Sequence, residues 1–172
     1  QFSYGLSNEL LALYYFQNDN FFVHQFFSHM FMHGSVSHLF FNMFALWMFG
    51  STLVNVWGNN KFIFFYFSCG IGAAIVQMTA TYFNIDPFIS SLTDAGIGNE
   101  QMMEILRGPI YNEAIYDFQT PMVGASGAIY GVVVAFAFLF PNTKLMLLFP
   151  PIPIKAKYLV PLLIIFDLIF GF

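Results

Sequence analysis

The chain has 172 residues, of which 58% are hydrophobic and only 8% are charged. Because soluble domains carry about 25% charged residues, we expect a membrane protein; a buried subunit of a large soluble complex is the alternative. The single cysteine, Cys69, excludes a disulfide framework and a zinc cluster, and the net charge of −4 argues against nucleic acid as a partner.

The N-terminal segment precedes the long apolar stretches. It lacks the basic start and cleavage site of a signal peptide, and it begins with Gln1 rather than methionine, so we expect the chain to start part-way through a longer protein. Leu6–Phe16 mixes apolar and polar residues and is expected to form an amphipathic helix at the membrane interface. Phe21–Met32 is rich in aromatic residues, which is typical of interfacial segments.

Four apolar stretches follow along the chain. A bilayer crossing needs about 20 apolar residues, and three stretches meet this requirement: Val36–Trp57, Phe62–Phe83 and Pro121–Phe140. The fourth, Tyr158–Phe172, is too short to cross, so we expect the chain to end inside a helix. The predicted fold class is therefore all-α, a polytopic transmembrane helix bundle that forms one membrane domain over residues 1–172 and is incomplete at both ends.

Charge predicts how the connections are oriented. The connection Asn84–Thr120 carries six acidic residues against the single Arg107, whereas the other basic residues lie between the first and second or between the third and fourth stretches: Lys61, Lys144, Lys155 and Lys157. The positive-inside rule makes the lysine side cytoplasmic, so the acidic connection and Gln1–Ser35 face outward. Within that connection, Asn99–Leu106 is expected to form a short surface helix.

Histidines cluster at the outer mouth of the first span. All four lie within fifteen residues: His24, His29, His33 and His38. Polar residues at membrane depth are costly and favour a functional interpretation. Ser35 or Ser37 can cap a helix that starts here. His38 and Asn42 are then four residues apart on one helix face, about one turn below the outer surface, with His33 just above them.

A serine of the third span is expected at the same depth. Pro121 suits a first helical turn, which places Ser126 one to two turns down from the same outer face as His38 and Asn42. Free N–H groups and the helix dipole near a helix N-terminus favour the negative charge that forms when serine attacks a carbonyl. Glycines on both sides of this serine let a substrate backbone approach closely.

Each of these features has a simpler explanation. The spacing Gly127-x-x-x-Gly131 is also the small-residue pattern of close helix packing in membranes, and the His38 and Asn42 side chains could bond across helices to satisfy each other. His29 and His33 have the spacing of metal ligands, but no acidic residue lies between them, so we predict no metal site. Polar groups inside the membrane would also suit a transporter or channel.

The residues together resemble the rhomboid family. His33-Gly34-Ser35-Val36-Ser37-His38-Leu39-Phe40-Phe41-Asn42 is similar to the motif His-x4-His-x3-Asn at the start of that family's second transmembrane helix. Gly124-Ala125-Ser126-Gly127-Ala128-Ile129-Tyr130-Gly131 resembles the nucleophile motif that opens its fourth helix. The resemblance covers essentially the whole chain, as helices two to five of six.

Rhomboids are intramembrane serine proteases, and the resemblance implies roles for the matching positions. Ser126 would be the nucleophile, and its backbone N–H would form the oxyanion hole with the side chains of His38 and Asn42. Supporting roles would fall to the glycines that shape the turn, to an aromatic residue that stacks on the catalytic histidine, and to a histidine that braces the outer loops: Gly124, Gly127, Tyr130 and His33. The expected partners are transmembrane protein substrates and the lipid bilayer, the expected location is a bacterial inner membrane with the site opening outward, and no cofactor is implied.

Two departures from the family pattern stand out. The family's general base is a histidine of the sixth helix, and no histidine follows Ser126 here, so we expect the base to lie beyond Phe172. The alternatives are a catalytically inactive relative that binds transmembrane helices, or His38 itself acting as the base. The family also often carries Trp-Arg where this chain has His24-Gln25, which affects the outer loop rather than proton transfer.

Overall fold

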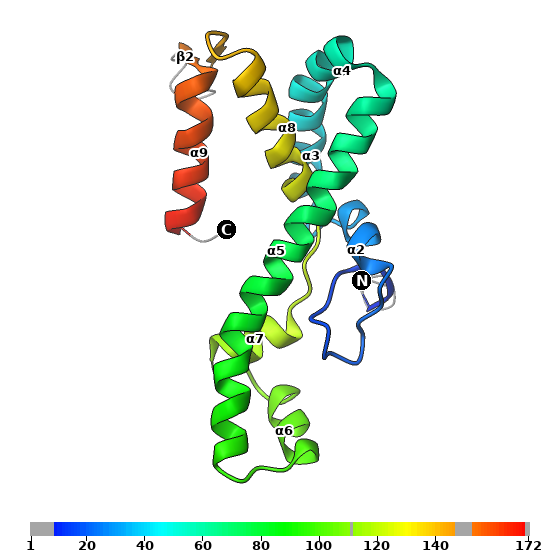
Figure 1. Cartoon of the computed structure of the whole chain (residues 1–172), viewed down its shortest axis with the longest axis vertical. Coiled ribbons are helices and arrows are strands. Elements are labelled where there is room, and N and C mark those ends of the chain that lie inside the picture. Colours follow the sequence, from blue (N-terminus) through cyan, green and yellow to red (C-terminus); the bar gives the residue numbers. More distant parts are fainter. Residues whose placement is uncertain (1–8, 111, 147–152, 171–172) are drawn as a thin grey trace.

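A computed structural model describes residues 9–110, 112–146 and 153–170, with side chains described up to residue 165 in the last helix. Its regular secondary structure is helical apart from one short hairpin, and Figure 1 shows helix α8 (Ser126–Leu139) between the long helix α5 (Asn59–Asp94) and helix α9 (Ala156–Phe170). The predicted all-α class is confirmed.

The first span forms as predicted. Helix α3 (Val36–Ala45), the π-helical segment η2 (Leu46–Gly50) and helix α4 (Ser51–Trp57) run on as one apolar helix with the expected bounds. The Ser35 hydroxyl accepts a hydrogen bond from the backbone N–H of His38 at 3.1 Å and so caps the helix start. Gly58 has φ of +77° and turns the chain into the next helix, which is a conformation that glycine adopts without strain.

The second span is longer than predicted. Helix α5 covers Asn59–Asp94, 36 residues, which at 1.5 Å per residue is about 54 Å, against roughly 30 Å of hydrocarbon in a bilayer. The helix therefore continues past Phe83, the expected end of the span, and beyond that point it has its own apolar contacts. Ile85 is fully buried there, in a cluster with Phe88 and Leu92.

The C-terminal end of α5 carries two short helices. Helix α6 (Asn99–Leu106) has the predicted bounds, whereas helix α7 (Glu113–Gln119), capped by the Asn112 side chain, was not expected. Both pack on the extension of α5 through a second apolar core that includes Leu106 and Ile115. In Figure 1 this group lies at the end of the molecule opposite α4.

The third predicted span begins later than expected. Helix α8 covers Ser126–Leu139, so Ser126 is its first residue rather than one to two turns down, and Pro121 is not helical. The physical reason is tertiary pairing. Met122 and Leu13 exchange two backbone hydrogen bonds, at 2.8 and 3.0 Å. The N–H and C=O groups of Met122 are therefore not available for helical hydrogen bonds. Gly124 follows with φ of +114°, which lies outside the helical region.

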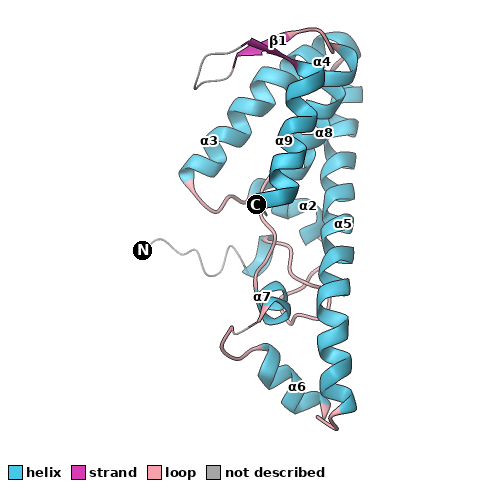
Figure 2. Ribbon diagram, turned by 90° about the vertical axis from the view of Figure 1, so that its left-hand side faces the viewer, coloured by secondary structure: helices cyan, strands magenta, loops and turns pink. Residues whose placement is uncertain are grey.

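The N-terminal segment is largely irregular. The amphipathic helix predicted over Leu6–Phe16 is wrong from Ala12 onward, and its first residues, 6–8, lie outside the described part of the chain. Two short helical pieces follow, α2 (Gln25–Ser28) and the 3₁₀ turn η1 (His29–Phe31). Figure 2 shows this segment beside the middle of α5, below α3 and α9.

A small hairpin connects α8 to the last helix. Strands β1 (Lys144–Met146) and β2 (Pro153–Lys155) pair antiparallel, and helix α9 (Ala156–Phe170) then runs back along α8. The sequence did not predict the hairpin. The apolar core between α4, α8 and α9 includes Leu53, Val132 and Val160.

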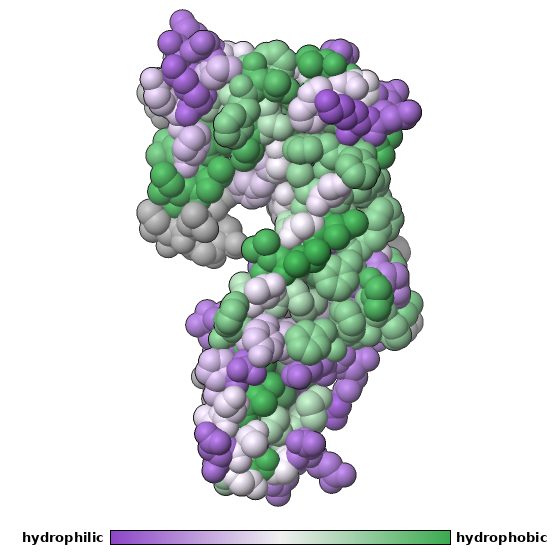
Figure 3. Space-filling view, in the orientation of Figure 1, coloured by the Kyte–Doolittle hydropathy of each residue, from purple (hydrophilic) through white to green (hydrophobic). Residues whose placement is uncertain are grey.

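The surface has the pattern of a chain embedded in lipid. Helices of spanning length and hydropathy are Val36–Trp57 and Asn59–Asp94, and Ser126–Leu139 is a shorter apolar helix. Large apolar side chains on these helices point outward, with Val36 and Phe138 each 82% exposed. Figure 3 shows hydrophobic residues over the middle of one face and hydrophilic residues toward the two ends.

Candidate active site

The turn before α8 brings a serine and a histidine together. A Cβ atom on Gly124 would lie 2.9 Å from Cε1 and 3.0 Å from Nε2 of His38, and 3.7 Å from the hydroxyl oxygen of Ser126. The His38 imidazole and the Ser126 hydroxyl therefore both lie close to the position that a Cβ atom on Gly124 would take. Only glycine fits there, because its φ of +114° disfavours a side chain and the imidazole fills the space that a side chain would need.

The start of α8 is electrostatically suited to a developing negative charge. Ala125 is the N-cap and offers no side-chain oxygen to the first turn, so the N–H groups that begin at Ser126 are not capped by a side chain. A helix N-terminus carries about half a positive charge. The structure thus places Ser126 closer to the helix end than the sequence predicted.

A cavity opens beside this serine. It has a volume of about 290 Å³ and lies between α3, α8 and α9. Its polar lining comes from His38, Asn42, Ser126 and Tyr130, and the remaining lining is apolar: Phe41, Ala45, Phe49, Ile129, Val133, Val160, Leu163 and Ile164. Such a cavity offers an apolar segment a few polar groups at one place, which is the usual character of a ligand site.

Two buried nitrogen atoms of the segment from His33 to Asn42 lack partners. Among the described residues, Asn42 Nδ2 and His33 Nε2 are the buried side-chain atoms that make no hydrogen bond. Asn42 is only 7% exposed, and a buried donor without a partner costs roughly 1–3 kcal/mol. The Asn42 amide is therefore free to donate to a group that enters the cavity, and the sequence suggestion that it bonds to His38 is not seen.

The second histidine of the motif packs against the first. The His33 ring meets the His38 ring edge to face, with 5.3 Å between their centroids. Burial lowers the pKa of His33 below its ordinary value, and the nearby His38 lowers that pKa further. A neutral imidazole at His33 places no positive charge beside the His38 ring.

The glycines after Ser126 serve helix packing. A Cβ atom on Gly127 would collide with Ala73, and one on Gly131 would collide with Cys69. Helices α5 and α8 thus approach closely through the Gly127-x-x-x-Gly131 face, as small residues allow in membranes. A role of Gly127 in shaping the nucleophile turn stays a prediction.

The N-terminal segment has polar anchors that the sequence interpretation missed. His24 Nε2 lies 2.7 Å from the Leu10 carbonyl oxygen, and the Gln25 side chain is buried with four hydrogen bonds. His29 is buried as well, which lowers its pKa, and its carbonyl oxygen accepts a hydrogen bond from the Gly124 N–H at 2.9 Å. The sequence signal for these anchors was that His24-Gln25 departs from the family's Trp-Arg pattern. This departure indicated the position but not the hydrogen bonds that the two side chains make.

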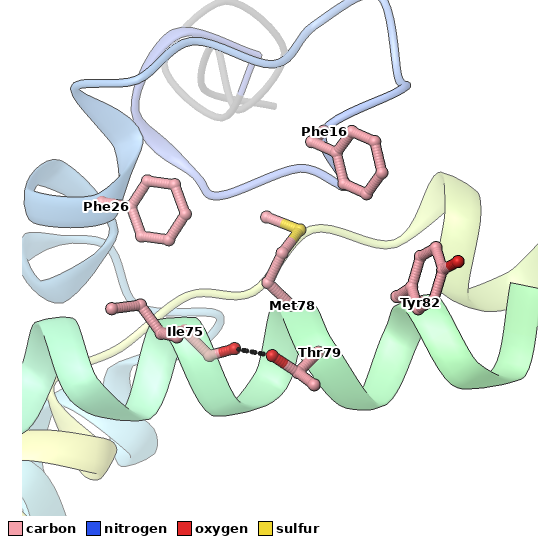
Figure 4. A pocket seen from close by; sticks show the side chains of 6 residues that line it. All are labelled: Phe16, Phe26, Ile75, Met78, Thr79 and Tyr82. Atoms are coloured by element: carbon pink, nitrogen blue, oxygen red, sulfur yellow. Dashed lines mark hydrogen bonds between the residues drawn. The ribbon is translucent and has the colours of Figure 1, made fainter.

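A second hollow lies away from this site. Figure 4 shows Phe16 and Phe26 of the N-terminal segment facing Met78 and Tyr82 of α5 around about 270 Å³. The Thr79 hydroxyl here donates to a carbonyl of its own helix at 2.8 Å. This lining contains no nucleophile paired with a base, and in the described part of the chain no three His, Cys, Asp or Glu side chains gather as metal ligands.

Comparisons with known proteins identify proteins that are similar to this chain. A family model described as "Rhomboid domain" matches residues 20–172. The chain is 28% identical over 123 residues to "Rhomboid protein 1, mitochondrial" of Saccharomyces cerevisiae, covering 72% of this chain and 27% of that protein. It is 28% identical over 121 residues to "Presenilin-associated rhomboid-like protein, mitochondrial" of Homo sapiens, covering 70% of this chain and 24% of that protein. The chain thus spans about a quarter of the length of these relatives, and no solved structure matches it.

Proposed function

The chain belongs to the rhomboid family, a family of polytopic integral membrane proteins, and we propose that it is part of an intramembrane serine endopeptidase. The substrates would be transmembrane segments of other proteins, cut near the outer leaflet through a Ser-His dyad. The observation that supports this most directly is that the Ser126 hydroxyl and the His38 imidazole, an expected oxyanion donor, both lie within 4 Å of the Cβ position of Gly124 and line the same cavity.

The proposed reaction starts with the Ser126 oxygen. A substrate helix unwinds near its outer end and presents a backbone carbonyl, which the oxygen attacks to form a C–O bond. The carbonyl π electrons move onto its oxygen, and that oxyanion accepts hydrogen bonds from the Ser126 N–H, His38 Nε2–H and Asn42 Nδ2–H. Each such donor stabilises the transition state by on the order of 3 kcal/mol.

A base must accept the proton that Ser126 loses and deliver it to the leaving amine as the C–N bond breaks, which leaves Ser126 acylated. Water then attacks the acyl carbonyl and gives a proton to the base, and the C–O bond to Ser126 breaks as the base returns that proton to the Ser126 oxygen. We place this base in a histidine of the sixth helix, beyond Phe172. The lysines are poor candidates, because Lys144 follows the far end of α8, and Figure 1 places the hairpin that contains it at the opposite end of that helix from Ser126.

The two ends of the molecule support the proposed orientation. Lys61 and the lysines of the hairpin lie at one end, and the acidic helices α6 and α7 lie at the other, on the side of Ser126 (Figure 1). The site then opens on the side opposite the lysines. The relatives, whose names place them in mitochondria, give no support to the bacterial inner membrane expected from the sequence, and we favour a mitochondrial membrane.

The test is cleavage of a transmembrane substrate by the full-length protein in proteoliposomes. We expect the wild type to cut a single-span substrate and Ser126→Ala to leave it intact while still co-purifying with it. If both proteins bind the substrate and neither cuts it, the inactive helix-binding alternative replaces the protease. If both proteins instead carry a solute flux, the transporter alternative gains support.

A further inference from the structure

The segment that leads into Ser126 is held by the N-terminal segment. Met122 exchanges two backbone hydrogen bonds with Leu13, at 2.8 and 3.0 Å, and the Gly124 N–H donates to the His29 carbonyl oxygen at 2.9 Å. These contacts come from residues more than ninety positions away in the sequence. The geometry of the nucleophile turn therefore depends on how the N-terminal segment is fixed.

One side chain organises that segment. Gln25 is 0% exposed, and its Oε1 accepts from the N–H groups of Tyr14 at 3.3 Å and Phe22 at 3.1 Å. Its Nε2 donates to the carbonyl oxygens of Asn20 at 2.7 Å and Glu9 at 3.2 Å. An amide side chain has two donor hydrogens and two acceptor lone pairs, so Gln25 uses its whole capacity to tie together four backbone groups of the irregular loop.

Two further hydrogen bonds connect this residue to the candidate site. His29 Nδ1–H donates to the Gln25 carbonyl oxygen at 2.8 Å, and His29 is only 1% exposed. The His29 carbonyl oxygen then accepts from the Gly124 N–H. Since Gly124 lies against both the His38 imidazole and the Ser126 hydroxyl, a shift at Gln25 is transmitted to the spacing of these two groups.

We propose that Gln25 is a positioning residue for the nucleophile turn, acting through His29 on Gly124. The inference rests on the proposed function of Ser126. It also gives a role to the His24-Gln25 pair, the place where the chain departs from the family pattern. A misplacement of reacting groups by about 1 Å can lower a rate by about 100-fold, so loss of the Gln25 bonds should act on the chemical step.

The experiment compares the full-length wild type with Gln25→Leu, which keeps the side chain's approximate size and removes its four hydrogen bonds. The first measurement is the rate at which a fluorophosphonate acylates Ser126, together with kcat and KM for a transmembrane substrate. We expect the labelling rate and kcat to fall about 10- to 100-fold, with KM within about twofold because the cavity lining is unchanged. The second measurement is amide hydrogen exchange over residues 120–126, which should rise by about tenfold as the Gly124 N–H loses its fixed acceptor.

Two controls separate positioning from general loss of stability. Leu53→Ala removes a fully buried side chain of the core between α4, α8 and α9 that does not itself line the cavity, so it should lower the melting temperature without changing labelling or exchange at 120–126. His29→Asn retains a side-chain N–H that can reach the Gln25 carbonyl and should recover most of the activity, whereas His29→Leu should lose activity as Gln25→Leu does.

The proposal is overturned if folded Gln25→Leu shows wild-type amide exchange and wild-type labelling. It is also overturned if Leu53→Ala, at the same melting temperature as Gln25→Leu, loses as much labelling. If the wild type is not labelled at all, the proposed function fails, and the exchange measurement still decides whether Gln25 fixes the turn. If Gln25→Leu does not fold, His29→Leu takes its place, because it removes only the hydrogen bond from His29 Nδ1 to the Gln25 carbonyl oxygen. The proposal then requires the same rise in amide exchange over residues 120–126 in His29→Leu.

Discussion

The His38 imidazole occupies the space that a side chain on Gly124 would need: a Cβ atom there would come within 2.9 Å of the ring. Gly124 lies two residues before Ser126 in the turn that opens α8, while His38 belongs to α3, so this contact fixes the nucleophile turn against the motif of the first span. The candidate site therefore requires a glycine at position 124.

Replacing this glycine should abolish activity. In Gly124→Ala the new methyl group would displace the His38 ring and strain the backbone at φ of +114°, so we expect fluorophosphonate labelling to fall by about 100-fold or more. Gly72→Ala is the matched control, because a Cβ atom there meets nothing within 4 Å. Similar labelling of the two variants would contradict the proposed geometry.

The unpaired amide of Asn42 should matter for rate and little for stability. Asn42→Leu should lower kcat by about 100- to 1,000-fold, the usual loss for one oxyanion donor, with KM nearly unchanged. Its melting temperature should equal or exceed that of the wild type, because the buried Nδ2 has no partner to lose. A large drop in melting temperature with normal kcat would show instead that Asn42 is structural.

The close packing of α5 on α8 should be sensitive to the side-chain volume at position 131. Gly131→Ala places a methyl group against Cys69, and we expect a loss of about 1–3 kcal/mol in the free energy of unfolding, as for other overpacked cores. Adding Cys69→Ala should recover part of this loss by removing the sulfur atom. Independent, additive effects of the two substitutions would argue against the contact.

Acid should weaken the outer loop. The pKa values of His29 and His33 lie below the ordinary value of 6.5 in the folded protein, mainly through burial, so the unfolded chain binds protons first as the pH falls. The stability that these neutral imidazoles contribute is fully present above pH 6.5 and decreases below it. We expect the melting temperature to fall as the pH drops below about 6.5, and the fall to be smaller in His29→Asn. An equal drop in that variant would assign the effect to other groups.

Membrane orientation is testable with single cysteines. In a Cys69→Ser background, Glu100→Cys in α6 should react with an impermeant thiol reagent from the side on which the site opens, and Lys144→Cys in β1 from the opposite side. The expectation follows from the positions of α6 and β1 at the two ends of the molecule (Figure 2). Reaction of both cysteines from one side would contradict the arrangement.

Local signals explain which elements the sequence could predict. The span Val36–Trp57 has the expected bounds because Ser35 caps it and Gly58 ends it, and both signals are local. The extension of α5 was missed because it depends on contacts of Ile85 with helices that come later in the chain.

The candidate site was predicted in part for a similar reason. Topology alone brought Ser126 to the depth of His38 and Asn42, since a membrane fixes which helix ends share a face. The start of α8 was misplaced because Pro121 fits a first helical turn locally, while pairing of Met122 with Leu13 decides the actual conformation. The anchoring by Gln25 rests on tertiary hydrogen bonds that no local pattern contains.

The most direct test of the account is to locate the adduct of a fluorophosphonate on the full-length protein by mass spectrometry. We predict one covalent adduct, on Ser126, that is absent in Ser126→Ala and strongly reduced in Gly124→Ala. An unlabelled wild type, or equal labelling of wild type and Ser126→Ala, would contradict the assignment of Ser126 as the nucleophile.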